Sequence, residues 1–211
     1  MSIIYLARHG ETEWNKEKIF RGTIDIPLSE QGKKEAVALA EYLKEEQIQF
    51  IYSSPLLRAK QTAQALAEKF SLEVKIEPGV IDLNFGDWQG KSIEQVKELD
   101  PKGFELWEKS PEKVIFPGGE SLAQARARAM EALERIAQNH PGEKGVVVSH
   151  RVICKLVVLS ALGSDESGFW RVQQDLACYN ILEKTEAGWK VWLLNHTCHL
   201  KNLPGHLRLD F

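Results

Sequence analysis

The 211-residue chain is predicted to be an α/β protein, with a mostly parallel central sheet and helices on both of its faces. Short apolar, β-branched segments alternate with longer segments in which apolar residues recur at helical spacing. Hydrophobic residues make up 43% of the chain, enough for a full core. No repeat, low-complexity segment or linker divides it, so we expect one domain over residues 1–211.

The first third of the chain contains three expected strands and two expected helices. The strands are expected at 2–7, 48–52 and 73–76, and the helices at 29–46 and 54–70. In the first helix, Ala36, Ala40 and Leu43 recur at helical spacing. The second helix is expected to begin with Ser54 as its N-cap and Pro55 at its first position, a favoured arrangement at helix starts.

Residues 77–119 differ in composition from the segments around them. This stretch is rich in Gly, Pro, Trp and charged residues, and it contains two short helical patterns, at 92–99 and 101–109. A long excursion from an α/β core is often functional. We therefore expect residues 77–119 to form a small helical lid.

The remainder of the chain returns to the α/β pattern. A long helix is expected from Ser121, because Gln124 completes a capping box with that serine. The most strand-like segment is 145–149, followed by a helix at 152–162. Two further strands are expected at 178–183 and 189–194.

Charge and composition exclude several classes of partner. A formal net charge of −3 argues against nucleic acid or an acidic membrane as the main partner. The first residues lack the features of a signal peptide. The longest apolar segment, 152–162, is interrupted by Lys155 and is too short to span a bilayer. With three cysteines, expected to be reduced and mostly buried, a cytoplasmic protein is expected.

Two histidines follow expected strands directly, His9 after the first and His150 after 145–149. In open parallel sheets, ligands bind at the carboxyl ends of the strands, so both imidazoles can face one crevice. Arg8 lies beside the first histidine, and Arg58 lies in the first turn of the helix at 54–70. Guanidinium groups and a helix N-terminus both suit an anion, so these residues together predict a site for a phosphoryl group.

Each of these signals also has a structural interpretation. A histidine after a strand is more often a hydrogen-bonded loop residue, and an arginine in a first turn is usually solvated. Zinc is the competing use for histidines, but there is no His-Glu-x-x-His and no paired-cysteine spacing. His140, which precedes Pro141 and Gly142, is interpreted as a structural residue at a helix end.

Short sequence blocks that form a recognisable pattern lie in order along nearly the whole chain. The first block is Arg8-His9-Gly10-Glu11-Thr12 with Trp14-Asn15. The later blocks are Gly22, Asp25, Pro27-Leu28-Ser29 and Gly32; Ser53-Ser54-Pro55, Arg58 and Thr62-Ala63; Gly86-Asp87-Trp88-Gln89-Gly90; Gly118-Gly119-Glu120-Ser121; and Val148-Ser149-His150. Together these blocks resemble those of the histidine phosphatase (phosphoglycerate mutase-like) superfamily, and so many ordered matches are very unlikely to arise by chance.

The resemblance implies a role for each matched residue. His9 would be the nucleophile that becomes phosphorylated, and Asp82 would be the general acid and base. The phosphoryl oxygens would be bound by Arg8, Arg58 and His150, with Asn15 and the Gly22 backbone nearby. Arginines supply the charge that phosphoryl transfer needs, so no metal and no organic cofactor is implied.

The chain departs from the family pattern at three positions. Asp82 stands where Glu is usual, and its side chain is shorter by about 1.5 Å. A misplacement of about 1 Å can cost on the order of a hundredfold in rate, so either the loop moves inward or activity is reduced. Arg21 replaces a common Gln and Arg151 a frequent Gly. Arg21 is interpreted as a substrate contact or a solvated residue, and Arg151 as a substrate contact or an outward structural residue.

The substrate class rests on the lid and on the tail. The segment 82–90 resembles the phosphatase branch, and 195–200 resembles metal-independent phosphoserine phosphatases and α-ribazole phosphatase-like members. His199 is interpreted either as a contact to a substrate carboxylate or as a packing residue. Three aromatic residues are interpreted as one wall of the cleft or as core, with core the commoner outcome: Trp88, Phe104 and Trp107.

The sequence therefore predicts a metal-independent phosphatase that hydrolyses small phosphate monoesters of the phosphoserine, α-ribazole phosphate or phosphoglycerate type. One alternative is a cofactor-dependent phosphoglycerate mutase, in which His9 returns the phosphoryl group to a sugar acid. Another is a non-enzymatic module that binds a phosphorylated ligand, suggested by the shortened acid. The expected partner is a small phosphorylated metabolite, and a homodimer is left open.

Overall fold

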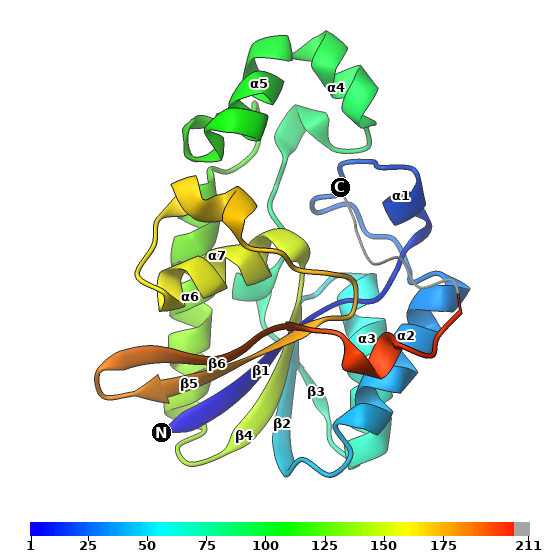
Figure 1. Ribbon diagram of the computed structural model, residues 1–211, viewed down its shortest axis with the longest axis vertical. Coiled ribbons are helices and arrows are strands. Elements are labelled where there is room, and N and C mark those ends of the chain that lie inside the picture. Colours follow the sequence, from blue (N-terminus) through cyan, green and yellow to red (C-terminus); the bar gives the residue numbers. More distant parts are fainter. Residues whose placement is uncertain (205–211) are drawn as a thin grey trace.

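A six-stranded sheet with the order β3-β2-β4-β1-β5-β6 forms the centre of the computed structural model, which describes residues 1–204 (Figure 1). The strands are β1 (Ser2–Arg8), β2 (Ile48–Ser53), β3 (Val74–Ile76), β4 (Lys144–Ser149), β5 (Tyr179–Thr185) and β6 (Gly188–His196). Strands β3, β2, β4 and β1 pair in parallel, whereas β5 pairs antiparallel with both β1 and β6. The predicted α/β class and mostly parallel sheet are confirmed.

Most of the predicted helices are present, with shifted ends. The α-helices are α1 (Glu13–Lys16), α2 (Glu30–Tyr42), α3 (Leu57–Phe70), α4 (Ile93–Leu99), α5 (Pro101–Lys109), α6 (Leu122–Asn139) and α7 (Arg151–Ala161). The 3₁₀ helices are η1 (Pro78–Val80), η2 (Gly86–Trp88), η3 (Pro111–Lys113), η4 (Glu166–Arg171) and η5 (Cys198–Leu200). The capping box of α6 is confirmed, since the Ser121 side chain accepts from the Gln124 N–H and the Gln124 side chain accepts from the Ser121 N–H.

The predicted start of α3 is wrong. The helix begins at Leu57 with Leu56 as its N-cap, not at Pro55 with Ser54 as the cap. The Ser54 N–H donates to the Val148 carbonyl, so the chain still pairs with β4 at this residue and cannot yet turn into a helix. The predicted helix at 29–46 likewise ends at Tyr42, and the single turn α1 was not predicted.

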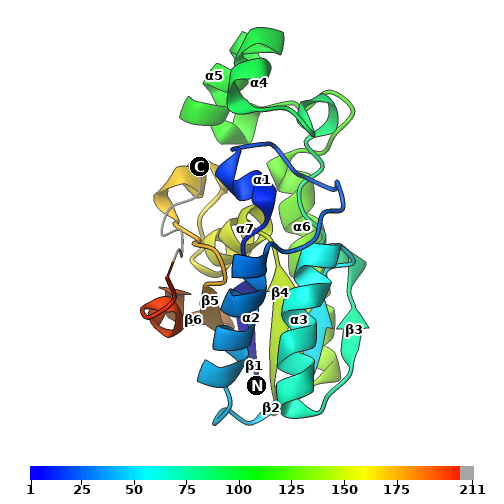
Figure 2. The same cartoon turned by 90° about the vertical axis from the view of Figure 1, so that its right-hand side faces the viewer.

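The sheet is covered on both faces, and each face has its own hydrophobic cluster. Along β1, Ile4 and Leu6 belong to the cluster under α6 and α7, whereas Tyr5 and Ala7 belong to the cluster under α2 and α3. This alternation follows from the two-residue period of a strand, and it makes β1 apolar on both sides. Figure 2 shows α2 and α3 side by side over one face.

Residues 77–119 leave the sheet and form a helical unit above the carboxyl ends of the parallel strands (Figure 1). Its aromatic side chains pack on one another and on α6 and α7, within the first of the two clusters. Trp88, Phe104 and Trp107 are each 5% exposed or less. The core interpretation of these three residues is therefore confirmed, and the interpretation of them as a cleft wall is wrong.

Two features of the described chain bear on the class of protein. No helix within residues 1–204 is long and apolar enough to cross a membrane. The cysteines are free thiols, with Cys154 and Cys178 buried and Cys198 exposed. This distribution matches the predicted mostly buried cysteines.

Replacing Trp88 by alanine should destabilise the protein strongly, because its side chain is fully buried among Phe20, Phe104 and Phe116. The free energy of unfolding, measured in urea, should fall by about 3–5 kcal/mol. Ile115→Ala is the control, since Ile115 lies in the same insertion but is 82% exposed and should change stability by less than about 0.5 kcal/mol. A loss of stability in Trp88→Ala as small as that in Ile115→Ala would show that the insertion does not share the core.

Candidate active site

Strands β1 and β4 are neighbours at the centre of the six-stranded sheet, and each is followed directly by a histidine. The imidazole rings of His9 and His150 lie with their centroids 5.2 Å apart. The His9 N–H donates to the Ser149 carbonyl, so the main-chain pairing of the two strands continues to the histidines. The expectation that both imidazoles face one place at the carboxyl end of the sheet is confirmed.

His9 is held in one tautomer by its own neighbour. Its Nδ1 lies 2.6 Å from the Gly10 carbonyl oxygen, which can only accept a hydrogen bond. Nδ1 therefore carries the proton, and Nε2 keeps its lone pair. The main chain at Gly10 is tightly packed, because an added Cβ would lie 2.5 Å from the Gly32 carbonyl oxygen. The Gly10 N–H also donates to Thr62 Oγ1 at 3.2 Å, which ties this segment to α3.

Three arginines surround the two histidines. Arg8 and Arg58 are completely buried, and Arg21 is 8% exposed. Arg8 donates to the Gln174 carbonyl at 2.7 Å, and Arg58 donates to the Gly22 and Ile24 carbonyls at 2.7 and 2.9 Å. Carbonyl acceptors satisfy guanidinium N–H groups without cancelling their charge, so the region remains suited to an anion.

Burial and the guanidinium charges keep both imidazoles neutral. Burial, followed by Arg58, Arg8 and Arg21, holds the pKa of His9 well below its usual value. Burial and Arg58 are also the main causes that lower the pKa of His150. A neutral His9 with a free Nε2 lone pair is the form that can attack phosphorus.

His150 is oriented by two groups that approach it from different elements. Its Nε2 lies 2.7 Å from Ser54 Oγ, and its Nδ1 lies 3.7 Å from Asp82 Oδ2. The Asp82 side chain is only 9% exposed, and its carboxyl group accepts from Arg58 Nη2 at 3.1 Å and from the Leu83 N–H at 2.9 Å. One carboxyl group therefore lies between a guanidinium and an imidazole, at the edge of the histidine pair.

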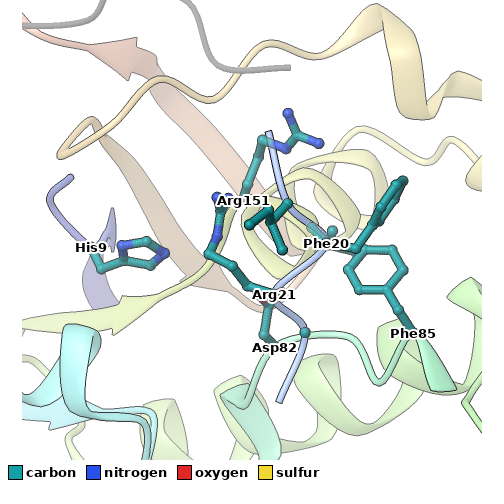
Figure 3. A pocket seen from close by; sticks show the side chains of 9 residues that line it. His9, Phe20, Arg21, Asp82, Phe85 and Arg151 are labelled. Atoms are coloured by element: carbon teal, nitrogen blue, oxygen red, sulfur yellow. The ribbon is translucent and has the colours of Figure 1, made fainter. Parts of the chain in front are cut away.

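The pocket in front of His9 is small and mostly polar, and it encloses about 340 Å³, including the part open to solvent. Figure 3 shows the rings of Phe20 and Phe85 on the side opposite His9, with Arg21 and Arg151 in the region between. The lining residues are His9, Ile19, Phe20, Arg21, Gly22, Asp82, Phe85, Arg151 and Val152. The residues that line it bring one imidazole, two guanidinium groups and one carboxyl group to the same small space.

Comparisons with known proteins agree with this geometry. Residues 4–197 match the histidine phosphatase superfamily (branch 1). The chain belongs to this superfamily. It is 41% identical over 197 residues to phosphoserine phosphatase 1 of Hydrogenobacter thermophilus, covering 93% of each chain. It is 35% identical to the metal-independent phosphoserine phosphatase of Arabidopsis thaliana, covering 99% of this chain and 87% of the relative.

The structure of Bacillus stearothermophilus YhfR superposes with a TM-score of 0.92 at 27% identity, covering 95% of this chain and 100% of that one. The fold is therefore that of the histidine phosphatases, as the resemblance predicted. This membership and the similarity to phosphoserine phosphatases identify the chain as a phosphatase.

Most of the predicted site residues of this histidine phosphatase lie together. Gly22 lines the pocket at φ +53°, and a Cβ there would lie 2.0 Å from Gln89 Oε1, so only glycine fits. Asn15 is buried beside the site, but its Oδ1 accepts from the main-chain N–H and the hydroxyl of Thr12. These contacts tie Asn15 to the turn after His9. Like the buried Arg8, Arg58 and His150, it is not among the described residues that line the pocket.

A contact of His199 with a substrate carboxylate stays a prediction, and the observed contacts of His199 are with protein groups. Its Nε2 donates to the Ala177 carbonyl at 3.0 Å, and its ring packs near Tyr42 and Tyr179. It is absent from the described residues that line the His9 pocket. The packing interpretation of His199 agrees with this position. His140 is also structural, since its ring stacks on that of Phe50 with the ring centroids 3.9 Å apart.

Sequence reasoning missed several residues around the site. Ser54 was interpreted as a helix cap, yet its hydroxyl contacts His150. Phe20 and Phe85 were not singled out, and they line the pocket in place of the tryptophans. Phe20 lies two residues before Gly22 of the second block, and Phe85 directly precedes Gly86 of the fourth, so a search of the positions just before these glycines would have found both phenylalanines. Within residues 1–204, no group of three or more His, Cys, Asp or Glu side chains is arranged to hold a metal ion.

The lowered pKa values of His9 and His150 have a measurable consequence. Nuclear magnetic resonance of the imidazole nitrogens should find both rings neutral at pH 6, with the His9 proton on Nδ1. The unfolded chain takes up a proton on each ring below about pH 6.5. The free energy of unfolding should therefore be at its full value above pH 6.5 and fall as the pH drops below it. A His9 titration midpoint near 6.5 would contradict this account.

Proposed function

We propose that the protein hydrolyses small phosphate monoesters without a metal, by way of a phosphohistidine on His9. The observation that carries the proposal is the hydrogen bond from Nδ1–H to the Gly10 carbonyl. It leaves the His9 ring neutral, with a free lone pair on Nε2, near Arg8 and Arg58. A histidine prepared in this way is a nucleophile next to a binding site for an anion.

In the first step, the Nε2 lone pair forms a bond to phosphorus while the ester oxygen–phosphorus bond breaks. The departing alkoxide takes its proton from the Asp82 carboxyl group. In the second step, Asp82 takes a proton from water as the water oxygen attacks phosphorus and the nitrogen–phosphorus bond breaks. Inorganic phosphate leaves and both residues return to their starting state. The position of Asp82 on the lining of the same pocket as His9 supports this assignment.

Charge on the transferred phosphoryl group would be balanced by the surrounding side chains. Arg8 and Arg58 are buried cations, and His150 Nδ1 is a buried nitrogen without a hydrogen-bond partner among the described residues. Fixed donors in a site that excludes water stabilise a transition state more strongly than the same donors in water. This arrangement supports phosphoryl transfer that needs no bound cation.

Among the candidate substrates, we propose a short phosphomonoester that carries a second anionic group, with L-phosphoserine as the reference compound. The two curated relatives described above are named as phosphoserine phosphatases. Arg21 and Arg151 both line the pocket beyond His9, and a carboxylate accepts charge-assisted hydrogen bonds from guanidinium groups. The small pocket favours a three-carbon substrate over a bulky one such as α-ribazole phosphate.

The insertion at 77–119 would contribute to substrate choice as a lid over the site. It supplies Asp82 and Phe85 to the pocket, and its helices α4 and α5 lie above the carboxyl ends of the strands (Figure 1). We include residues 1–211 in a single functional domain, because the aromatic side chains of the insertion belong to the same hydrophobic cluster as α6 and α7.

The mechanism predicts phosphate release from L-phosphoserine that continues in excess EDTA and is lost in His9→Ala. Wild-type protein quenched during turnover should carry an acid-labile, base-stable phosphoryl group on His9, located by mass spectrometry. His196→Gln, which removes a histidine outside the pocket, is the control and should keep full activity. Turnover that persists in His9→Ala would refute the proposal.

Two other outcomes would support the alternative functions. Phosphate binding without turnover of p-nitrophenyl phosphate would support a binding module, and label transfer between phosphoglycerate isomers would support a mutase.

If Arg151 binds the second anionic group of the substrate, Arg151→Gln should impair only substrates that carry that group. Phosphoethanolamine is L-phosphoserine without its carboxylate, so it cannot use a guanidinium in that position. The variant should lower kcat/KM for L-phosphoserine by about ten- to a hundredfold, and for phosphoethanolamine by less than about threefold. Arg171→Gln, an exposed arginine outside the pocket, controls for the change in net charge. Equal losses on both compounds would place the carboxylate elsewhere.

A further inference from the structure

The loop that carries Asp82 has no regular structure after the short helix η1 (Pro78–Val80), yet its main chain is held throughout. Four consecutive carbonyl groups, from Gly79 to Asp82, each accept a hydrogen bond from a side chain outside the loop. Three of these bonds come from one residue, Arg128, and the fourth comes from Ser149 Oγ to the Val80 carbonyl. An exposed loop would leave such groups to water.

Arg128 lies in α6 and uses its whole guanidinium group. It donates to the carbonyls of Gly79, Ile81 and Asp82 at 2.8, 2.7 and 3.0 Å. Its Nε and Nη2 also donate to the two carboxylate oxygens of Glu120, at 3.0 and 2.6 Å. This set matches the planar fork of five donors that only arginine provides.

Glu120 extends the same contact to the far side of Asp82. Its Oε1 accepts from the Asn84 N–H at 3.0 Å, and its own N–H donates to the Asn84 carbonyl at 3.0 Å. The residues before Asp82 are therefore fixed by Arg128, and those after it are fixed by Glu120. The loop also lies tight against α6, because a Cβ at Gly79 would be 2.6 Å from the Ala132 Cβ.

We infer that Arg128, paired with Glu120, is a positioning residue that sets how far Asp82 reaches into the pocket. The inference rests on the proposed function, since it assigns the purpose of the contact to proton transfer by Asp82. An aspartate is shorter than a glutamate by about 1.5 Å, so its main chain must lie closer to the leaving oxygen. A fixed main chain supplies that position, and a shift of about 1 Å can cost on the order of a hundredfold in rate.

The test uses two substrates that differ in their need for the acid. The alkoxide that leaves L-phosphoserine needs a proton, whereas p-nitrophenolate leaves without one. The parameter kcat/KM reports the step that forms the phosphohistidine for both compounds. Arg128→Lys keeps the charge but not the fork, and Gly79→Ala displaces the same loop while keeping every charged group. Both should lower kcat/KM for L-phosphoserine by roughly ten- to a hundredfold, and for p-nitrophenyl phosphate by less than about threefold.

Arg126→Gln is the matched control. Arg126 lies in the same helix with similar side-chain exposure, but its contacts, with Glu166 at 2.9 Å and with the Ser164 carbonyl, lie outside the Asp82 loop. It should leave both substrates unchanged. Asp82→Asn should give the same selective loss as Arg128→Lys, and adding Arg128→Lys to Asp82→Asn should cause little further loss.

Three outcomes would overturn the inference: equal losses on both substrates, no loss in either variant, or a full additional loss in the Asp82→Asn background. If Arg128→Lys does not fold, Gly79→Ala and Glu120→Gln decide the matter alone. Activity that survives His9→Ala would instead refute the proposed function. A failure of the positioning role would appear as His9-dependent activity without substrate selectivity in the loop variants.

Discussion

The hydrogen bond from His9 Nδ1 to the Gly10 carbonyl is the interaction on which the rest of the site depends. It decides which nitrogen of the ring is free, and its acceptor is the neighbouring main chain, so the ring cannot turn without breaking this bond. The close contact between Gly10 and Gly32 and the bond from Gly10 to Thr62 hold that main chain against α2 and α3. The nucleophile is therefore oriented by the packing of the fold as a whole.

The electrostatic arrangement follows from the same constraint. A protonated His9 would have no lone pair. Burial first, and then the charges of the nearby arginines, make protonation of His9 unfavourable, and the same arginines attract an anion. Burying guanidinium groups is costly unless their N–H groups are satisfied. Arg58 meets this need largely with the main-chain carbonyls of Gly22 and Ile24 and with one oxygen of Asp82. Because most of these acceptors are uncharged carbonyl groups, the positive charge of the arginines is only partly neutralised and can still attract the substrate.

Much of this was accessible from the sequence, because period-two and helical patterns are local. The histidines after β1 and β4 and the arginine near the start of α3 could be located in this way, and the motif resemblance added Asp82. Long-range pairing could not be predicted. Ser54 remains bonded to β4 instead of capping α3, which only the sheet register reveals. The tryptophans of the insertion and Phe20 have similar hydrophobicity, so composition cannot say which of them faces the pocket.

The separation of the hydrophobic residues into two clusters has a consequence for how such a protein diversifies. The residues that present His9 rest partly on the cluster beneath α2 and α3, whereas the insertion above the pocket belongs to the opposite cluster. Sequence drift in the insertion can therefore reshape the entrance while the buried face beside α2 and α3 is preserved. A scaffold of this kind can acquire new selectivity by changing the insertion around a retained Asp82, while the other half of its interior continues to present His9.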